Sequence, residues 1–65
     1  MNIKKSMAYE YEILKETFIE NCDTMSDSEF NYTLGRLNTL AGYTGNLQDY
    51  VINVLRTAEQ KIAEV

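Results

Sequence analysis

Carboxylates and one thiol are the side chains of this 65-residue chain that could carry chemistry. Glu12, Glu16 and Glu20 recur every four residues, which places them on one face of a helix. Paired carboxylates can act as acid and base. A chain this short, however, has little room to enclose a substrate. We therefore interpret this row as a charged contact surface and expect no enzymatic activity.

The usual partners of a nucleophile or a metal ion are missing from the sequence. The chain contains one cysteine and no histidine, which leaves out histidine-activated nucleophiles, the common zinc arrangements and an internal disulfide. Cys22 falls near Glu20 and Asp23 at the expected end of a helix, where a thiolate is disfavoured. The sequence contains neither an acidic loop of the EF-hand type nor a glycine-rich phosphate loop. We expect no catalytic, metal or cofactor site.

Size and composition favour one small helical domain covering residues 1–65. A domain of this length buries only about 60% of the surface of its unfolded chain, so regular helix packing or self-association must supply stability. Apolar residues make up 45% of the chain and proline is absent, which favours long helices. The sequence has neither a signal peptide nor an apolar run long enough to span a membrane. We therefore expect a cytoplasmic protein.

The first expected helix covers residues 3–22. Its apolar residues are spaced three or four positions apart, as on one helix face: Ile3, Met7, Tyr11, Leu14, Phe18 and Cys22. Ile13 and Ile19 flank this stripe and are expected to widen it. The resulting face should meet two neighbouring helices.

The second expected helix covers residues 27–41. Ser26 and Glu29 have the spacing of a capping box, with Met25 and Phe30 placed for a hydrophobic staple. The expected apolar stripe consists of Phe30, Leu34, Leu37, Leu40 and Ala41. Gly42 is expected to end the helix. Gly35, inside the helix, marks either a close helix crossing or a tolerated glycine.

The third expected helix covers residues 47–63, with Asn46 as its cap. Its stripe is spaced almost as a heptad seam: Leu47, Val51, Val54, Ala58, Ile62 and Val65, with Tyr50 and Leu55 beside it. Packing against a core explains this spacing better than a coiled coil of so few heptads. Short loops favour antiparallel neighbours, so we predict an all-α, compact three-helix bundle. If the first helix extends away from the other two, two chains can pair into a larger bundle, and on size and stripe width we expect the chain to self-associate as a homodimer.

Residues 37–56 resemble the helix-turn-helix of phage-repressor type. Ala41, Gly45 and Val51 stand at the small, glycine and branched-apolar positions where the two helices of that motif meet, and Val54 is a further match. The resemblance implies a small dimeric DNA-binding regulator. The expected recognition helix has a net charge of −1 from five charged residues: Asp49, Arg56, Glu59, Lys61 and Glu64. Because nucleic-acid binding normally begins with a basic face, direct binding of nucleic acid is not our first expectation.

Acidic residues are concentrated in one segment of the chain. Residues 10 to 29 contain seven acids and one base, a net charge of −6, and the remainder carries +2. The negative electrostatic field of such a segment attracts basic partners. Tyr9, Tyr32 and Tyr43 lie off the apolar stripes and are expected to be partly exposed. The candidate partner-binding surface consists of Tyr9, Glu12, Glu16 and Glu20.

The sequence therefore favours an acidic, non-enzymatic helical protein that binds a larger macromolecule. The expected partner is a protein with a basic surface, which this chain would inhibit or modulate. Small single-domain proteins of this kind are typical of bacteriophages and mobile elements. The alternatives are the dimeric helix-turn-helix regulator and a homo-oligomeric scaffold protein.

Overall fold

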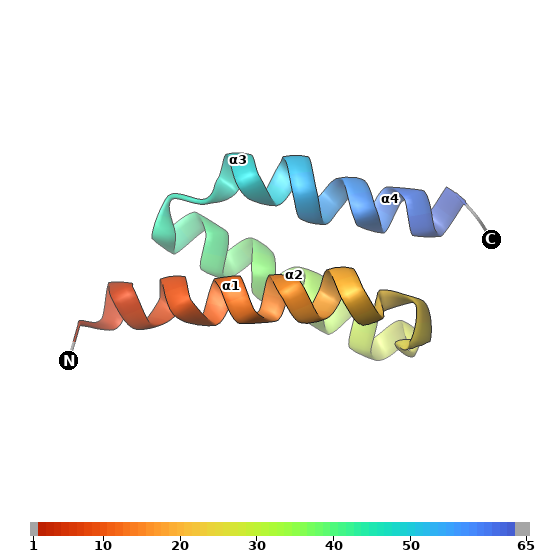
Figure 1. The fold of residues 1–65 in the computed structure, drawn as a ribbon, viewed down its shortest axis with the longest axis horizontal. Coiled ribbons are helices and arrows are strands. Elements are labelled where there is room, and N and C mark those ends of the chain that lie inside the picture. The colour runs from red at the N-terminus through yellow and green to blue at the C-terminus, as the bar shows by residue number, and fades with distance from the viewer. Residues whose placement is uncertain (1, 64–65) are drawn as a thin grey trace.

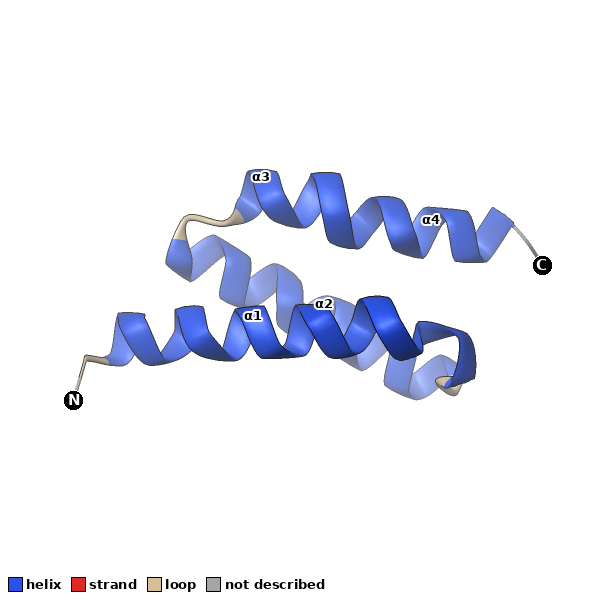
Figure 2. Ribbon diagram, in the orientation of Figure 1, coloured by secondary structure: helices blue, strands red, loops and turns tan. Residues whose placement is uncertain are grey.

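Three helical segments form the fold in a computed structural model, which describes residues 2–63 (Figure 1). α1 covers Ile3–Asn21 and α2 covers Asp27–Thr44. The third segment runs without a break through α3 (Leu47–Asp49), the π-helical stretch η2 (Tyr50–Leu55) and α4 (Arg56–Ala63). Figure 2 shows helices joined by short connections, with no strand within the described part of the chain. The predicted all-α three-helix bundle is confirmed.

Short connections make each segment run back along the one before it (Figure 1). A 3-10 turn, η1 (Cys22–Thr24), lies between α1 and α2. The bundle is elongated, with extents of 42 × 20 × 16 Å. α1 packs against both α2 and the third segment, as expected from its broad apolar stripe. Its first turn extends past the corner where α2 gives way to α3 (Figure 1), which leaves Ile3 exposed.

The predicted capping box begins α2. The backbone N–H of Glu29 donates to Ser26 Oγ at 3.2 Å, and the backbone N–H of Ser26 donates to Glu29 Oε1 at 3.2 Å. These two bonds satisfy donors that a helix start leaves free. Met25 and Phe30, the expected staple, both pack against the core.

The predicted end of α2 at Gly42 is wrong. Gly42 continues the helix, which ends at Gly45 with φ 76° and with its N–H donated to the Ala41 carbonyl. This left-handed conformation favours glycine, so Gly45 is the residue that stops α2. A Cβ placed on Gly35 would meet no atom within 4 Å. Gly35 is therefore a tolerated glycine, at a cost of about 1 kcal/mol relative to alanine, and marks no close crossing inside the bundle.

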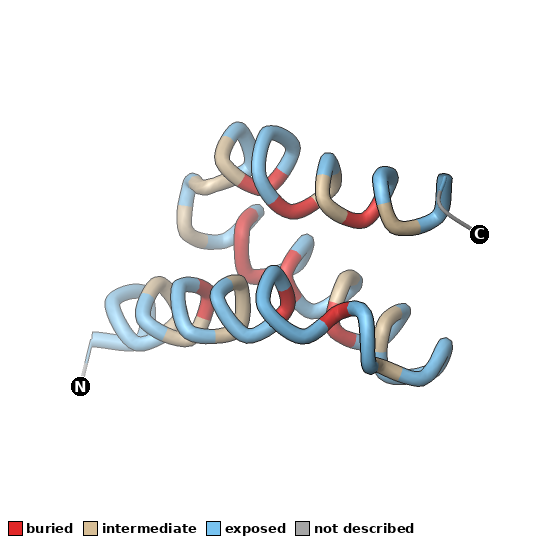
Figure 3. The backbone as a smooth tube through the Cα atoms, turned by 45° about the vertical axis from the view of Figure 1, so that its right-hand side comes forward, coloured by how far each residue is buried: buried red, intermediate tan, exposed pale blue. Residues whose placement is uncertain are grey.

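The core consists of side chains from all three segments. Its largest fully buried members are Tyr11, Phe18, Leu37, Leu40 and Val54, and Figure 3 shows the buried positions facing the centre of the bundle. The ring of Phe18 packs on that of Phe30 at 5.2 Å between centroids, which ties α1 to the start of α2. Ile13 and Ile19, expected to widen the stripe of α1, are instead exposed.

The predicted stripe of the third helix is correct in its middle and wrong at its ends. Val54 and Ala58 are buried, but Leu47, Val51 and Ile62 are exposed. Val65 lies outside the described residues. The π-helical turns of η2 account for the difference at Leu47 and Val51, because each i→i+5 bond takes one more residue per turn and shifts the inward-facing positions. Tyr50 rather than Val51 therefore faces the core. Ile62 lies in the regular helix α4, after the buried Ala58.

Candidate functional site

The four predicted partner-binding residues lie together on the outer face of α1. At 3.6 residues per turn, Tyr9, Glu12, Glu16 and Glu20 point to one side of the helix, and all four are exposed. Tyr9 is 69% exposed. Ile13 lies on the same side and is 47% exposed. We define the α1 outer face as Tyr9, Glu12, Ile13, Glu16 and Glu20.

Several acids of the predicted negative segment are paired, at the surface, with other residues of the same chain. Glu10 accepts two-pronged hydrogen bonds from Arg36 of α2, at 2.8 to 3.0 Å. Glu12 lies 3.4 Å from Lys15 Nζ. Asp23 forms an ion pair with Lys61 of α4, and Glu29 caps its own helix. These contacts reduce the negative charge that is available to a partner.

Glu16 and Glu20 have no cationic partner within residues 2–63. They are one helical turn apart and both are exposed. Beside them, towards the N-terminus of α1, Tyr9 and Ile13 border a shallow hollow that also involves Ser6. The α1 outer face thus has an acidic half and an apolar half.

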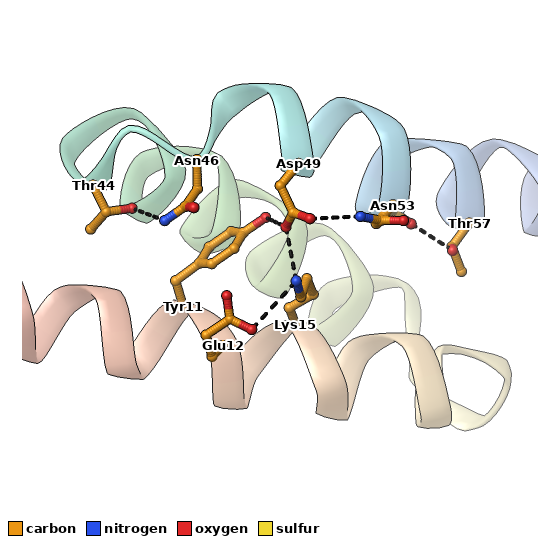
Figure 4. Close-up of polar contacts among 8 residues, drawn as sticks. All are labelled: Tyr11, Glu12, Lys15, Thr44, Asn46, Asp49, Asn53 and Thr57. Carbon is orange, nitrogen blue, oxygen red and sulfur yellow. Dashed lines mark hydrogen bonds and ion pairs between the residues drawn. The ribbon is translucent and has the colours of Figure 1, made fainter.

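A polar cluster on the inner side of α1 was not predicted from the sequence (Figure 4). The Tyr11 hydroxyl donates to Asp49 Oδ2 at 2.6 Å, and Lys15 Nζ donates to the same oxygen at 2.9 Å. Asn53 Nδ2 donates to the other carboxylate oxygen at 2.6 Å. Lys15 Nζ also lies 5.4 Å from the centre of the Tyr11 ring, within range of a cation–π contact. Asp49 therefore accepts three hydrogen bonds and joins α1 to the third segment.

Hydrogen bonds and burial shift the pKa values of the residues in this cluster. The hydrogen bond from Lys15, followed by that from Tyr11, lowers the pKa of Asp49. Burial, reinforced by the bond to Asp49, raises the pKa of Tyr11. The bond to Asp49 raises the pKa of Lys15. Asp49 is thus held as a carboxylate between a neutral phenol and an ammonium group, and we assign the cluster a structural role.

The residues of this cluster are visible in the sequence, but their spacing does not indicate that they meet. Tyr11 was expected on the apolar stripe, and it is fully buried, as expected. The sequence showed Asp49 only as one acid of the third helix. The prediction that Asn46 caps this helix is wrong, because its side chain makes no capping bond. Asp49 lies in α3, directly before η2, and nothing in the local sequence indicates that it meets α1.

Cys22 is buried, in agreement with the sequence-based interpretation. Burial and the neighbouring Asp23 raise the pKa of its thiol, which is the opposite of what activates a cysteine nucleophile. Within residues 2–63 no group of three or more cysteine, aspartate or glutamate side chains could hold a metal ion.

The helix-turn-helix resemblance is matched in part. Ala41 and Val54 are buried, and Gly45 has the left-handed conformation of a turn between helices. Val51 is 56% exposed, so its expected position where the two helices meet is wrong. The exposure of Val51 has the same cause as that of Leu47, the phase shift in η2.

No helix in the described part of the chain is both long and apolar enough to cross a bilayer. No protein-family model, no curated protein and no solved structure matches the sequence or the fold.

Proposed function

We propose that this chain is a non-enzymatic interaction protein that binds a basic surface on a larger protein and thereby inhibits or modulates it. The contact surface is the α1 outer face. The observation that carries the proposal is the exposure of Glu16 and Glu20 without a cationic partner within residues 2–63, next to exposed Tyr9.

The acidic half and the apolar half of the α1 outer face contribute differently to binding. Exposed carboxylates accelerate encounter with a basic surface and fix its orientation. Tyr9 and Ile13 offer apolar contact area, and tyrosine is enriched at interfaces. Glu16 and Glu20 are separated by about 6 Å along the helix axis. The complementary surface therefore has two lysine or arginine side chains at a similar spacing, beside an apolar area.

Bonds to the other two helical segments hold α1 in place before a partner arrives. Tyr11 and Lys15 bind Asp49 of the third segment, and Glu10 binds Arg36 of α2. These bonds restrain α1 from both neighbouring helices. A surface that is ordered in advance loses less entropy on binding.

Capture from the source cells, with matched charge reversals, tests the proposal. The immobilised chain and its Glu16→Lys/Glu20→Lys variant are compared with Glu59→Lys, which reverses an exposed acid on α4. We expect one protein to be retained by the original chain and by Glu59→Lys and to be lost from the double variant. Titration of that purified protein should then show at least a tenfold loss of affinity, or about 1.4 kcal/mol. Equal retention by all three chains would disprove the surface assignment.

Photo-crosslinking locates the contact independently of charge. A benzoylphenylalanine at position 9 should form an adduct with the captured protein. The control is the same replacement at position 32, because Tyr32 on α2 is exposed to a similar extent, 72% against 69% for Tyr9. An adduct from position 32 alone would place the binding surface on α2 instead.

A DNA-binding regulator remains the second candidate function. Its support is the left-handed Gly45 between α2 and α3, together with the burial of Ala41 in α2 and of Val54 in η2. Lys61, one of the two bases expected to meet DNA, forms an ion pair with Asp23. The test is a mobility shift of duplex DNA at low salt, which Arg56→Ala should weaken. The absence of any shift would remove this candidate.

A further inference from the structure

A long stretch of the chain is almost free of charge. Residues 30 to 48 contain one charged residue, Arg36, although 25% of the whole chain is charged. The Arg36 guanidinium is bound by the Glu10 carboxylate through Nε and Nη2. The surface formed by the second half of α2 and the start of α3 is therefore electrically neutral.

This neutral surface has exposed apolar side chains around a hollow. Tyr43 is 66% exposed and Leu47 is 50% exposed. Both line a shallow hollow together with Asn38, Thr39 and Gly42. Val51 follows Leu47 one turn later and is also exposed. We call this surface, at the end of the bundle where α2 gives way to α3 (Figure 1), the corner patch: Asn38, Thr39, Gly42, Tyr43, Leu47 and Val51.

We propose that the corner patch binds a second copy of this chain in a two-fold symmetric dimer. Charge identifies the occupant. Each copy has a net charge of −4, so two copies repel each other, and contact between their α1 outer faces would set carboxylates against carboxylates. A neutral patch allows two acidic copies to approach at the least electrostatic cost.

Shape is consistent with the same occupant. A two-fold interface uses one patch on both copies, so the patch must be complementary to itself. Tyr43, which is 66% exposed, lines the hollow of the corner patch together with Leu47, and a rotated copy would set its own Tyr43 and Leu47 against that hollow. A small specific interface needs about 600 Å² from each partner, roughly one eighth of the 4696 Å² that the chain exposes. The α1 outer face stays free in such a dimer.

Two threonine substitutions with the same change in charge test the dimer. Thr39→Glu introduces a carboxylate into the hollow. Thr17→Glu introduces one at an exposed position of α1. Light scattering and sedimentation over a concentration series should show a dimer for the original chain. The dissociation constant should rise at least tenfold in Thr39→Glu and less than about threefold in Thr17→Glu. A monomer at every concentration up to about 1 mM, or equal effects of the two substitutions, would overturn the proposal.

Two glycine substitutions test the position of the contact without changing charge. A Cβ at Gly35 or at Gly42 meets no atom within 4 Å apart from the adjacent residues and backbone of its own helix, so alanine at either site should raise the thermal stability of the monomer. Gly42 lines the hollow and Gly35 does not. Gly42→Ala should therefore weaken the dimer about tenfold while Gly35→Ala leaves it unchanged. The same dissociation constant for both variants would place the interface outside the corner patch.

Discussion

The Tyr11 hydroxyl donates a 2.6 Å hydrogen bond to the carboxylate of Asp49, which lies 38 positions further along the chain. Because the acceptor is charged, this bond should be worth more than a neutral one. We expect Tyr11→Phe to lower the free energy of unfolding by about 1.5–3 kcal/mol. Tyr50→Phe is the control, since it removes a 3.2 Å bond to the uncharged carbonyl of Leu34, at a cost of about 1 kcal/mol. Urea denaturation measures both, and equal losses would contradict the assigned role of Asp49.

Acid should weaken the fold in part through Asp49. Its pKa is lowered in the folded chain, mainly by Lys15. The stabilisation is therefore complete above the unfolded value of about 3.9 and is lost as the pH falls through the lower, folded value. In Asp49→Asn, the loss of unfolding free energy between neutral pH and about pH 3 should be smaller than in the original chain. Denaturation at both pH values tests this, and an unchanged loss would contradict it.

Gly45 and Gly35 should respond to alanine in opposite directions. Gly45 has φ 76°, where a side chain costs roughly 1–2 kcal/mol. Gly35 is helical and its missing Cβ would meet nothing, so alanine there should stabilise by about 1 kcal/mol. Thermal unfolding of the two variants, at a concentration where the chain is monomeric, shows whether each substitution raises or lowers the stability. Stabilisation by Gly45→Ala would show that α2 does not end in the left-handed conformation.

Val54 and Val51 distinguish the observed phase of the third segment from an uninterrupted heptad. Val54 is fully buried and Val51 is largely exposed. Val54→Thr places a hydroxyl in the core and should cost about 1–3 kcal/mol. Val51→Thr should change the unfolding free energy by less than about 0.5 kcal/mol in the monomer. Equal costs would mean that both valines face the core and that η2 does not shift the phase.

Glu16→Lys should stabilise the fold while weakening the proposed binding. Glu12 and Glu20 lie four residues to either side of Glu16 and repel it. Replacing each repulsion with an attraction should add roughly 0.5–1 kcal/mol at low salt and little at high salt. Thermal unfolding at two salt concentrations measures this, with Glu59→Lys as a control that has no such pair of neighbours. A loss of stability in Glu16→Lys would contradict the expected repulsion. Any loss of binding by this variant could then result from unfolding.

The helices themselves were largely predictable because their signals are local. The capping box of Ser26 and Glu29 marks the start of α2 in sequence and in structure. The apolar period of residues 3–22 predicted α1 to within one residue of its observed end at Asn21. Two glycines, however, could each have ended α2. The helix continues past Gly42 and ends at Gly45, which has the left-handed φ of 76°, and no spacing in the local sequence separates these two glycines.

The sequence by itself determined three helices, the capping box at the start of α2 and one acidic helix face, since each depends on residues no more than about four positions apart. Tertiary structure decided the rest. The packed helices bury Tyr50 of η2, whose hydroxyl donates to the Leu34 carbonyl of α2, and bring Asp49 to Tyr11 and Lys15. The pairs Glu10–Arg36 and Asp23–Lys61 join residues far apart in the chain. Only the arrangement of the helices brings such pairs together, and it thereby leaves Glu16 and Glu20 available on the outer face of α1.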